Sequence, residues 1–239
     1  MSAMRVYIGF DRREQDAYEV AEFSLRRHSS RPVVVTPLIL ERLQAAGLSE
    51  RPYRVHRNSL WDVLSDAPCS TEFSNSRFLT PLLAQTGWAL FIDCDMLFLG
   101  DVTQLFALAD PRYAVMVVKH QHAGDEGIKM DGCEQTRYAR KNWSSVMLFN
   151  CDHPSNRSLT LRMLNNLPGR DLHQFCWLTD AEIGELPETW NWLVGVQPKP
   201  SAVQLAHYTL GMPFMRGYEA APYSNLWWAE QRMMKDRCG

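Results

Sequence analysis

Short runs of consecutive apolar residues recur along the chain and alternate with stretches that are polar or amphipathic. The strand-like runs are Arg5–Phe10, Val33–Val35, Trp88–Ile92, Ala114–Val118 and Ser145–Phe149. A continuous apolar run of about five residues is typical of a strand buried on both faces, as in a parallel sheet. The pattern therefore predicts a sheet whose strands lie in the interior of the protein.

Amphipathic stretches between these runs predict the helices. Asp11 is followed three residues later by Glu14, which is a capping-box pattern, and Ala17, Val20 and Ala21 then recur at helical spacing. Further helices are expected at Leu38–Ala46, Arg77–Thr86, Asp101–Leu108 and Ser158–Leu167. Alternating strands and helices predict an α/β fold, with an open, twisted, mostly parallel sheet flanked by helices.

Three parts of the chain depart from this alternation. Residues from Ser49 to Ser76 and from His120 to Lys141 are polar and irregular, which indicates long loops. The last third has weak helix signals and many large rings, among them Trp190, Trp192, Trp227 and Trp228. We expect these indoles to pack the loops onto the sheet, and a platform for an acceptor sugar is the alternative. No linker or repeat divides the chain, so residues 1–239 are interpreted as one domain with a loop-rich C-terminal part.

Composition excludes several classes of protein. The 239 residues carry 25 basic and 27 acidic side chains, whereas nucleic-acid-binding domains usually have a basic excess. The 13 glycines and 13 prolines are too few for a collagen-like or disordered chain. We therefore expect a globular protein that does not bind nucleic acid and that buries its core without disulfides.

Signals for export or membrane insertion are not apparent in the sequence. A membrane-spanning helix needs about 20 apolar residues, whereas Trp88–Ile92 and Ala114–Val118 are among the longest apolar runs. The first residues include Arg5, Asp11 and Arg12 rather than the apolar core of a signal peptide. The six cysteines form no C-x-x-C pair. We expect reduced thiols in a cytoplasmic protein without a transmembrane segment.

Two carboxylates directly after a buried strand give the clearest chemical signal. Asp93 and Asp95 lie within the apolar segment Phe91–Phe98. At the end of a strand, side chains at i and i+2 can bracket one hard cation, Mg²⁺ or Mn²⁺, which prefers oxygen ligands. A metal would also offset the cost of burying carboxylates among apolar neighbours. The alternative is a solvated turn in which one aspartate caps a helix.

Histidines could supply a third ligand. His207 follows the strand-like run Val203–Ala206 and could complete a site begun by the two aspartates. A lone histidine is, however, also common at the surface or as a hydrogen-bonded core residue. His120 and His122 have a spacing that could bind a metal, but their polar surroundings favour an ordinary loop.

Several segments in fixed order resemble one enzyme family. Phe10-Asp11 at the end of a strand, Arg77, Phe91–Phe98, Trp143–Asn150, Asp180 and His207-Tyr208 follow one another as in the family 8-type retaining glycosyltransferases, the glycogenin and bacterial galactosyltransferase group. The resemblance covers about residues 4–215. It implies a GT-A fold, a nucleotide-sugar donor, most simply a UDP-sugar, and a Mn²⁺ (or Mg²⁺) ion.

The resemblance also implies roles for individual residues. Asp93, Asp95 and His207 would hold the metal, and Asp180 would be the catalytic-site carboxylate that faces the sugar. The implied donor-binding residues are Ile8, Gly9, Phe10, Asp11, Arg77, Asp93, Cys94, Asp95, Asn150 and Gly211. About residues 4–118 would form the nucleotide-binding half, and about 119–239 the half for the sugar and acceptor.

The sequence departs from the family pattern at three places. Ala181 stands where a glutamine usually follows the acidic residue, and Asn142-Trp143-Ser144-Ser145 replaces Phe-Asn-Ser/Ala-Gly. The segment after His207 has Gly211 one residue late and lacks the phosphate-binding lysine of the family. The candidates for the missing positive charge are Lys119, Lys129, Arg140 and Lys141.

The sequence thus predicts a metal-dependent glycosyltransferase that acts with retention on an acceptor that is a glycan, a lipid or a protein. A non-catalytic protein that binds sugar nucleotides is one alternative, because the diphosphate-binding segment is altered. A phosphatase or phosphotransferase of the haloacid-dehalogenase type is another, with Asp93 as nucleophile beside Mg²⁺. Against it, that motif usually lies near the N-terminus, and Leu97 stands where those enzymes have Thr or Val. No motif indicates an oligomeric state.

Overall fold

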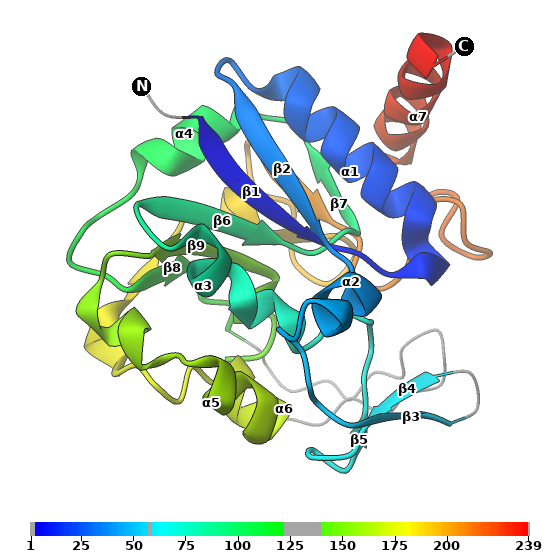
Figure 1. The fold of residues 1–239 in the computed structure, drawn as a ribbon. Coiled ribbons are helices and arrows are strands. Elements are labelled where there is room, and N and C mark those ends of the chain that lie inside the picture. Colours follow the sequence, from blue (N-terminus) through cyan, green and yellow to red (C-terminus); the bar gives the residue numbers. More distant parts are fainter. Residues whose placement is uncertain (1–2, 57–58, 122–139, 239) are drawn as a thin grey trace.

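A six-stranded sheet forms the centre of the molecule (Figure 1). The computed structural model describes residues 3–56, 59–121 and 140–238. The strands of the central sheet are β1 (Met4–Gly9), β2 (Val33–Leu38), β6 (Trp88–Ile92), β8 (Val115–Val117), β9 (Val146–Asn150) and β10 (Ile183–Glu185), in the order β10-β8-β9-β6-β1-β2. β9 runs antiparallel to both of its neighbours, and the other pairs are parallel. The predicted open, mostly parallel sheet flanked by helices is therefore confirmed.

Helices flank this sheet. The α-helices are α1 (Gln15–His28), α2 (Leu40–Ala45), α3 (Thr80–Ala84), α4 (Val102–Ala107), α5 (Leu161–Asn166), α6 (Gly169–His173) and α7 (Ser224–Cys238). The 3-10 helices are η1 (Arg12–Glu14), η2 (Ser76–Leu79), η3 (Trp143–Ser145), η4 (Pro154–Ser158), η5 (Asp180–Glu182) and η6 (Glu188–Trp190). Helix α1 packs against α7, and α3 packs against β6. Among the residues that the structure describes, no helix combines the length and apolar character needed to cross a membrane.

A small second sheet joins distant parts of the chain. Its strands are β7 (Met96–Phe98), β11 (Trp192–Leu193) and β12 (Leu205–His207), in the order β11-β12-β7. β7 and β12 are antiparallel, with Met96 opposite His207. The segment Asp93–Asp95 connects β6 of the central sheet to β7 of this one. The two sheets therefore meet where the sequence places its paired carboxylates.

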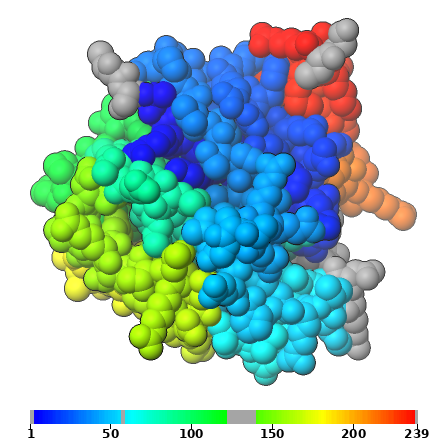
Figure 2. All heavy atoms as spheres, viewed as in Figure 1, coloured from blue at the N-terminus to red at the C-terminus, as the bar shows by residue number. Residues whose placement is uncertain are grey.

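A third sheet covers one side of the molecule. It is a meander of β3 (Tyr53–His56), β4 (Ser59–Asp62) and β5 (Ala67–Pro68). Figure 2 shows this segment, in cyan, lying against the segment of α5 and α6, in yellow-green. The buried Arg51 joins them, because it donates to the carbonyls of Leu164 and Leu167 and pairs with Asp62.

Several expected elements differ from the structure. The region from Ser49 to Ser76 was expected to be irregular, but it contains β3, β4 and β5. The second strand, expected at Val33–Val35, continues through Pro37 to Leu38, because β2 is an edge strand and proline is tolerated where no ladder donor is needed. The weak helix signals of the last third hid the 15-residue helix α7. Thr160, rather than Ser158, begins the helix of the fifth amphipathic stretch, as the N-cap of α5.

The core confirms that the indoles of the last third serve mainly as packing. Trp190 lies in the large apolar cluster around the central sheet, while Trp192 and Trp227 belong to a second cluster beneath α1 and β7. All three are buried, and the half-buried Trp228 packs edge-to-face on Trp227.

Replacing Trp190 with alanine should therefore destabilise the fold. Because the side chain is only 4% exposed, truncation leaves a cavity, and we expect Trp190→Ala to lower the free energy of unfolding by about 3–5 kcal/mol. Denaturant titration followed by circular dichroism measures this. The control is Trp228→Ala, at a half-buried position, which should lower the free energy of unfolding less. An unchanged unfolding curve for Trp190→Ala would instead favour a surface role for this ring.

Candidate functional site

Three candidate metal ligands converge where the central and small sheets meet. One ligand atom from each of Asp93, Asp95 and His207 lies within 4.8 Å of the others. The backbone brings them together, because Asp93 N–H donates to the carbonyl of Ser145 over 3.0 Å and Tyr208 N–H donates to that of Asp95 over 2.9 Å. The two carboxylates are partly buried and the imidazole is buried.

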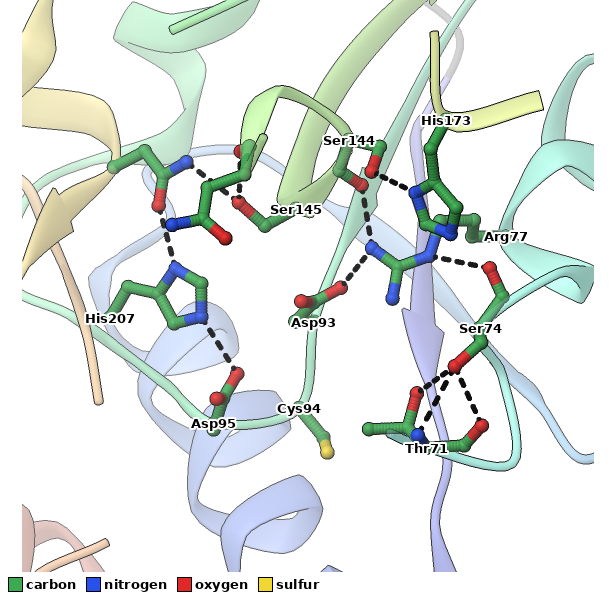
Figure 3. A network of polar contacts seen from close by, with 12 residues as sticks. Thr71, Ser74, Arg77, Asp93, Cys94, Asp95, Ser144, Ser145, His173 and His207 are labelled. Atoms are coloured by element: carbon green, nitrogen blue, oxygen red, sulfur yellow. Dashed lines mark hydrogen bonds and ion pairs between the residues drawn. The ribbon is translucent and has the colours of Figure 1, made fainter. Parts of the chain in front are cut away.

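The donor atoms of this cluster suit a divalent cation. His207 Nε2 lies 3.2 Å from Asp95 Oδ1, and His207 Nδ1 contacts Asn191 Oδ1 at 2.9 Å (Figure 3). Nε2 is therefore the ring nitrogen that faces the carboxylates. Two carboxylate oxygens and one imidazole nitrogen form a ligand set that Mn²⁺ and Mg²⁺ accept.

Arg77 holds the first aspartate in place. Its Nη1 lies 2.8 Å from Asp93 Oδ1 and donates to the carbonyl of Ser144 over 2.8 Å, while its Nε donates to the carbonyl of Ser74 (Figure 3). The guanidinium is buried and lies over the rings of Phe73 and Phe91. The sequence predicted Arg77 as a donor contact, and its partner here is Asp93.

A cavity of about 550 Å³ opens beside Asp93. Arg77, Lys141, Ser144 and His173 line it together with Asp93, and the segment of β4 and β5 forms another part of its wall. Ser144 Oγ and His173 Nδ1 lie 2.7 Å apart. Of the predicted sources of an extra positive charge, Lys141 lines this cavity. Lys119 and Arg140 lie over the ring of Trp143, and Lys129 lies outside the described residues.

The loop after β1 is organised by Asp11. Burial alone raises the pKa of this carboxyl, but hydrogen bonds from the side chain and backbone of Arg13 and from the backbone of Glu72 lower the pKa below its usual value. Gly9 is required here, since a Cβ atom would lie 2.3 Å from the buried ring of Phe73. Ile8 is buried in β1, and Phe10 packs edge-to-face on Tyr18.

Glu14 is an acidic residue of the site that the sequence pattern assigned to a helix cap. Asp11 caps η1 by accepting from Arg13 N–H, while the Glu14 carboxylate accepts from the thiol of Cys94 at 3.3 Å. Burial, and then the charge of Asp95, raise the pKa of Glu14 to about 7. Cys94 is fully buried, and burial raises the pKa of its thiol well above the usual value. The predicted capping box is therefore wrong in its Glu14 half.

Some predicted residues lie elsewhere. Asn150 pairs with Trp88 at the start of β6, whereas Asp93 follows the end of that strand, so the antiparallel register places Asn150 at the opposite end of the strands from Asp93. The prediction of a donor-binding Asn150 is therefore not supported by its position. Gly211 lies in the loop after His207, where a Cβ atom would meet the ring of Tyr218. The predicted pair of histidines is only partly described: His120 is buried and contacts Gln197, and His122 lies outside the described residues.

Asp180 is placed at the surface. Thr179 and Glu182 form the capping box of η5, and Asp180 is the first residue of that 3-10 helix. The carboxylate of Asp180 is 90% exposed and pairs with Arg140, which also donates to the carbonyl of Gln174. Asp180 is not among the residues that line the cavity beside Asp93. Its role toward a sugar therefore stays a prediction.

Two residues in contact with this site carried no motif in the sequence. Asn191, which is buried, contacts His207, and Ser145 bonds both Asn191 and the backbone of Asp93. Asn191 lies directly after η6 and Ser145 ends η3, and their contacts with His207 and with each other are visible only in the structure. A sequence signal was present only for Ser145, as a departure from the family pattern.

Comparison with known proteins identifies one sequence relative and a shared fold. The chain is 43% identical over 229 residues to Protein CDI of Arabidopsis thaliana, an alignment that covers 93% of this chain and 84% of that protein. No family model matches the sequence. Among solved structures, the apo form of the glycosyltransferase GlyE of Streptococcus pneumoniae superposes with a TM-score of 0.62 at 13% identity, over 99% of this chain and 63% of the GlyE chain.

The galactosyltransferase LgtC, solved in complex with donor and acceptor sugar analogs, gives the same result. Its TM-score is 0.60 at 13% identity, and the alignment covers 96% of both chains. Likeness at this level of identity shows a common fold, and that fold is the GT-A type. The chain spans less than two thirds of the GlyE chain, so that protein contains further residues without a counterpart here.

The raised pKa of Glu14 predicts how stability depends on pH. Between the usual pKa of 4.5 and the raised value of about 7, the folded, metal-free protein holds a proton on Glu14 that the unfolded chain releases, so stability falls as pH rises through this window and levels off above it. Glu14→Gln removes the effect and should be more stable than wild type at pH 8, by roughly 1–3 kcal/mol, and similar at pH 5. Thermal melts at both pH values measure this. The exposed Glu188→Gln is the control, and an unchanged pH slope in Glu14→Gln would contradict the assignment.

Proposed function

This chain belongs to the family of Arabidopsis thaliana Protein CDI, and we propose that it is a glycosyltransferase that uses a nucleotide-sugar donor. The observation that carries the proposal is the cluster of Asp93, Asp95 and His207, on a GT-A fold, where β6 ends. Ligands of open α/β sheets bind beyond the carboxyl ends of the strands, and this cluster lies there. A UDP-sugar as donor, retention of configuration and membership of the family 8 type are further parts of the proposal.

Asp93, Asp95 and His207 are the proposed ligands of a Mn²⁺ or Mg²⁺ ion. When bound, such a cation neutralises the charge that develops on the leaving diphosphate. The site needs this charge compensation, because the carboxylates of Asp93 and Asp95 lie close together and would repel a diphosphate. Arg77 fixes the orientation of Asp93 by an ion pair with its Oδ1, on the side of Asp93 that faces away from His207 (Figure 3).

Residues around the cluster are proposed to bind the nucleoside, the sugar with the acceptor, and the diphosphate. The loop of Gly9, Phe10 and Asp11 at the end of β1 is the proposed contact for the nucleoside. The cavity between Asp93 and His173 is the proposed room for the transferred sugar and the acceptor group, which is a glycan, a lipid or a protein. Lys141, in the wall of this cavity, is the proposed replacement for the diphosphate-binding lysine that the C-terminal segment lacks.

Retention is proposed to follow from attack on the face from which the diphosphate departs. In such a step the acceptor oxygen forms a bond to the anomeric carbon as the carbon–oxygen bond to the diphosphate breaks, and the proton of the acceptor hydroxyl passes to the departing diphosphate oxygen. The positive charge that develops on the sugar is favoured by nearby carboxylates.

A screen of nucleotide sugars for Mn²⁺-dependent release of free nucleotide, with water as acceptor, identifies the donor. Binding of UDP without turnover of any donor would support the non-catalytic alternative instead.

Removing one ligand should abolish metal-dependent nucleotide binding. We expect Asp95→Ala to remain folded and to lose the increase in UDP affinity that Mn²⁺ gives the wild type, as measured by isothermal titration calorimetry. The metal-free variant should melt slightly higher than wild type, because one of the crowded carboxylates is gone.

The matched control is Asp110→Ala, since Asp110 pairs with Arg112 at the surface. That variant should bind UDP and Mn²⁺ like the wild type. If the wild type itself bound UDP with the same affinity in the presence and absence of Mn²⁺, the metal site would be refuted.

Asp180 is proposed to face the donor sugar, as the resemblance implies. In the structure it pairs with Arg140, and the next residue, Lys141, lines the cavity. Asp180→Asn should then keep the fold and the UDP affinity and lower turnover by at least roughly 10²-fold, or about 2.7 kcal/mol of barrier. Single-turnover kinetics with the identified donor measures this, with Asp171→Asn on α6 as the control. Turnover close to wild type would leave Asp180 as a surface residue paired with Arg140.

A further inference from the structure

A buried chain of hydrogen bonds leads from a backbone carbonyl to the imidazole of His207. Ser145 Oγ donates to the carbonyl of Asn142 over 2.7 Å, Asn191 Nδ2 donates to Ser145 Oγ over 2.8 Å, and Asn191 Oδ1 lies 2.9 Å from His207 Nδ1. Asn191 is fully buried, and His207 and Ser145 are buried as well. Water therefore does not compete for these groups.

The direction of every hydrogen bond in this series follows from the carbonyl of Asn142, at which the series begins. A carbonyl only accepts, so the single proton of the Ser145 hydroxyl is committed to Asn142. The hydroxyl oxygen must then accept from Asn191, which fixes the amide with its nitrogen toward Ser145 and its oxygen toward His207. Because an amide oxygen only accepts, Nδ1 of His207 carries the proton.

This proton assignment leaves the lone pair of neutral His207 on Nε2. In this form Nε2, which faces Asp95 Oδ1 at 3.2 Å, presents its lone pair to a cation shared with that carboxylate. The chain of hydrogen bonds thus presents His207 in the form that binds a metal. Ligating histidines commonly donate their other N–H to an oxygen acceptor, which fixes the ring and strengthens the ligand.

We propose that Asn191 and Ser145 are positioning residues that lock the Nε2-ligating tautomer of His207. The inference rests on the proposed function, since it gives His207 the role of a metal ligand. Ser145 serves both sides of the site: its side chain directs Asn191, while its carbonyl accepts from the backbone N–H of Asp93. A serine at this position, where the family 8-type pattern has glycine, therefore supplies a hydroxyl to the site.

Metal titration of paired variants tests the proposal. Asn191→Leu removes the acceptor for Nδ1–H and should weaken Mn²⁺ binding about 10–100-fold, as measured from the electron paramagnetic resonance signal of free Mn²⁺. Asn191→Asp keeps an oxygen facing Nδ1 and should restore most of the affinity. Ser145→Ala removes only a hydroxyl and should weaken binding less than Asn191→Leu.

The control is Asn156→Leu. Asn156 is also buried, donating to the carbonyls of Ala114 and Asn150 and accepting from Trp177, but it lies outside the candidate site. This variant should lose stability as Asn191→Leu does, yet keep the Mn²⁺ affinity of the wild type. Affinity that is unchanged in Asn191→Leu, or lowered equally in Asn156→Leu, would overturn the proposal.

A second measurement needs no metal. Nitrogen-15 NMR of the metal-free protein, at a pH where the imidazole is neutral, should show a protonated Nδ1 and an unprotonated Nε2 for His207. In Ser145→Ala the other tautomer should become populated. A wild-type His207 protonated at Nε2 would overturn the proposal. Wild-type protein that fails to bind Mn²⁺ but has the Nδ1–H tautomer would refute the metal site while leaving the hydrogen-bond chain in place.

Discussion

The antiparallel pairing of β7 with β12 is the constraint on which the candidate site depends. β7 begins directly after Asp95 and β12 ends at His207, and the register sets Met96 opposite His207. The hydrogen bond from Tyr208 N–H to the carbonyl of Asp95 continues this ladder. Backbone bonds therefore hold the histidine beside the carboxylates before any side chain contributes, and the histidine itself is buried.

Ser144 and Ser145, which lie in η3 directly before β9, connect the rest of the site to this pairing. The carbonyl of Ser144 accepts from Arg77, which holds Asp93, and Ser145 bonds both Asp93 and Asn191. Several carboxylates collect around this point, so the site has an excess of negative charge at its centre. We propose that a bound cation turns that excess into a binding site for a diphosphate, while Arg77 pairs with Asp93 and also lines the cavity beside it.

The fold and part of the site could be predicted from local pattern. Continuous apolar runs identified β1, β6 and β9, and the position of Asp93 and Asp95 after such a run placed them at the end of a strand. His207 could be proposed because it follows a short strand-like run. Helix α7 was missed because its sequence mixes aromatic and charged residues without a strong apolar face.

Contacts between segments that are distant in the sequence could not be predicted from the pattern of apolar and polar residues. Asn150 was expected at the site. The antiparallel direction of β9, which no local signal encodes, places it instead at the other end of the strands. Glu14 matched a cap pattern, but the turn of η1 directs it to Cys94. Asn191 has no motif, and only the arrangement of η6 beside β12 reveals its contact with His207.

The most direct test of the metal site is a crystal structure with UDP and Mn²⁺, with anomalous scattering measured at the manganese edge. We expect one strong anomalous peak coordinated by carboxylate oxygens of Asp93 and Asp95 and by Nε2 of His207, with the diphosphate on its open side. A peak away from these three residues, or UDP bound with no peak beside them, would contradict it.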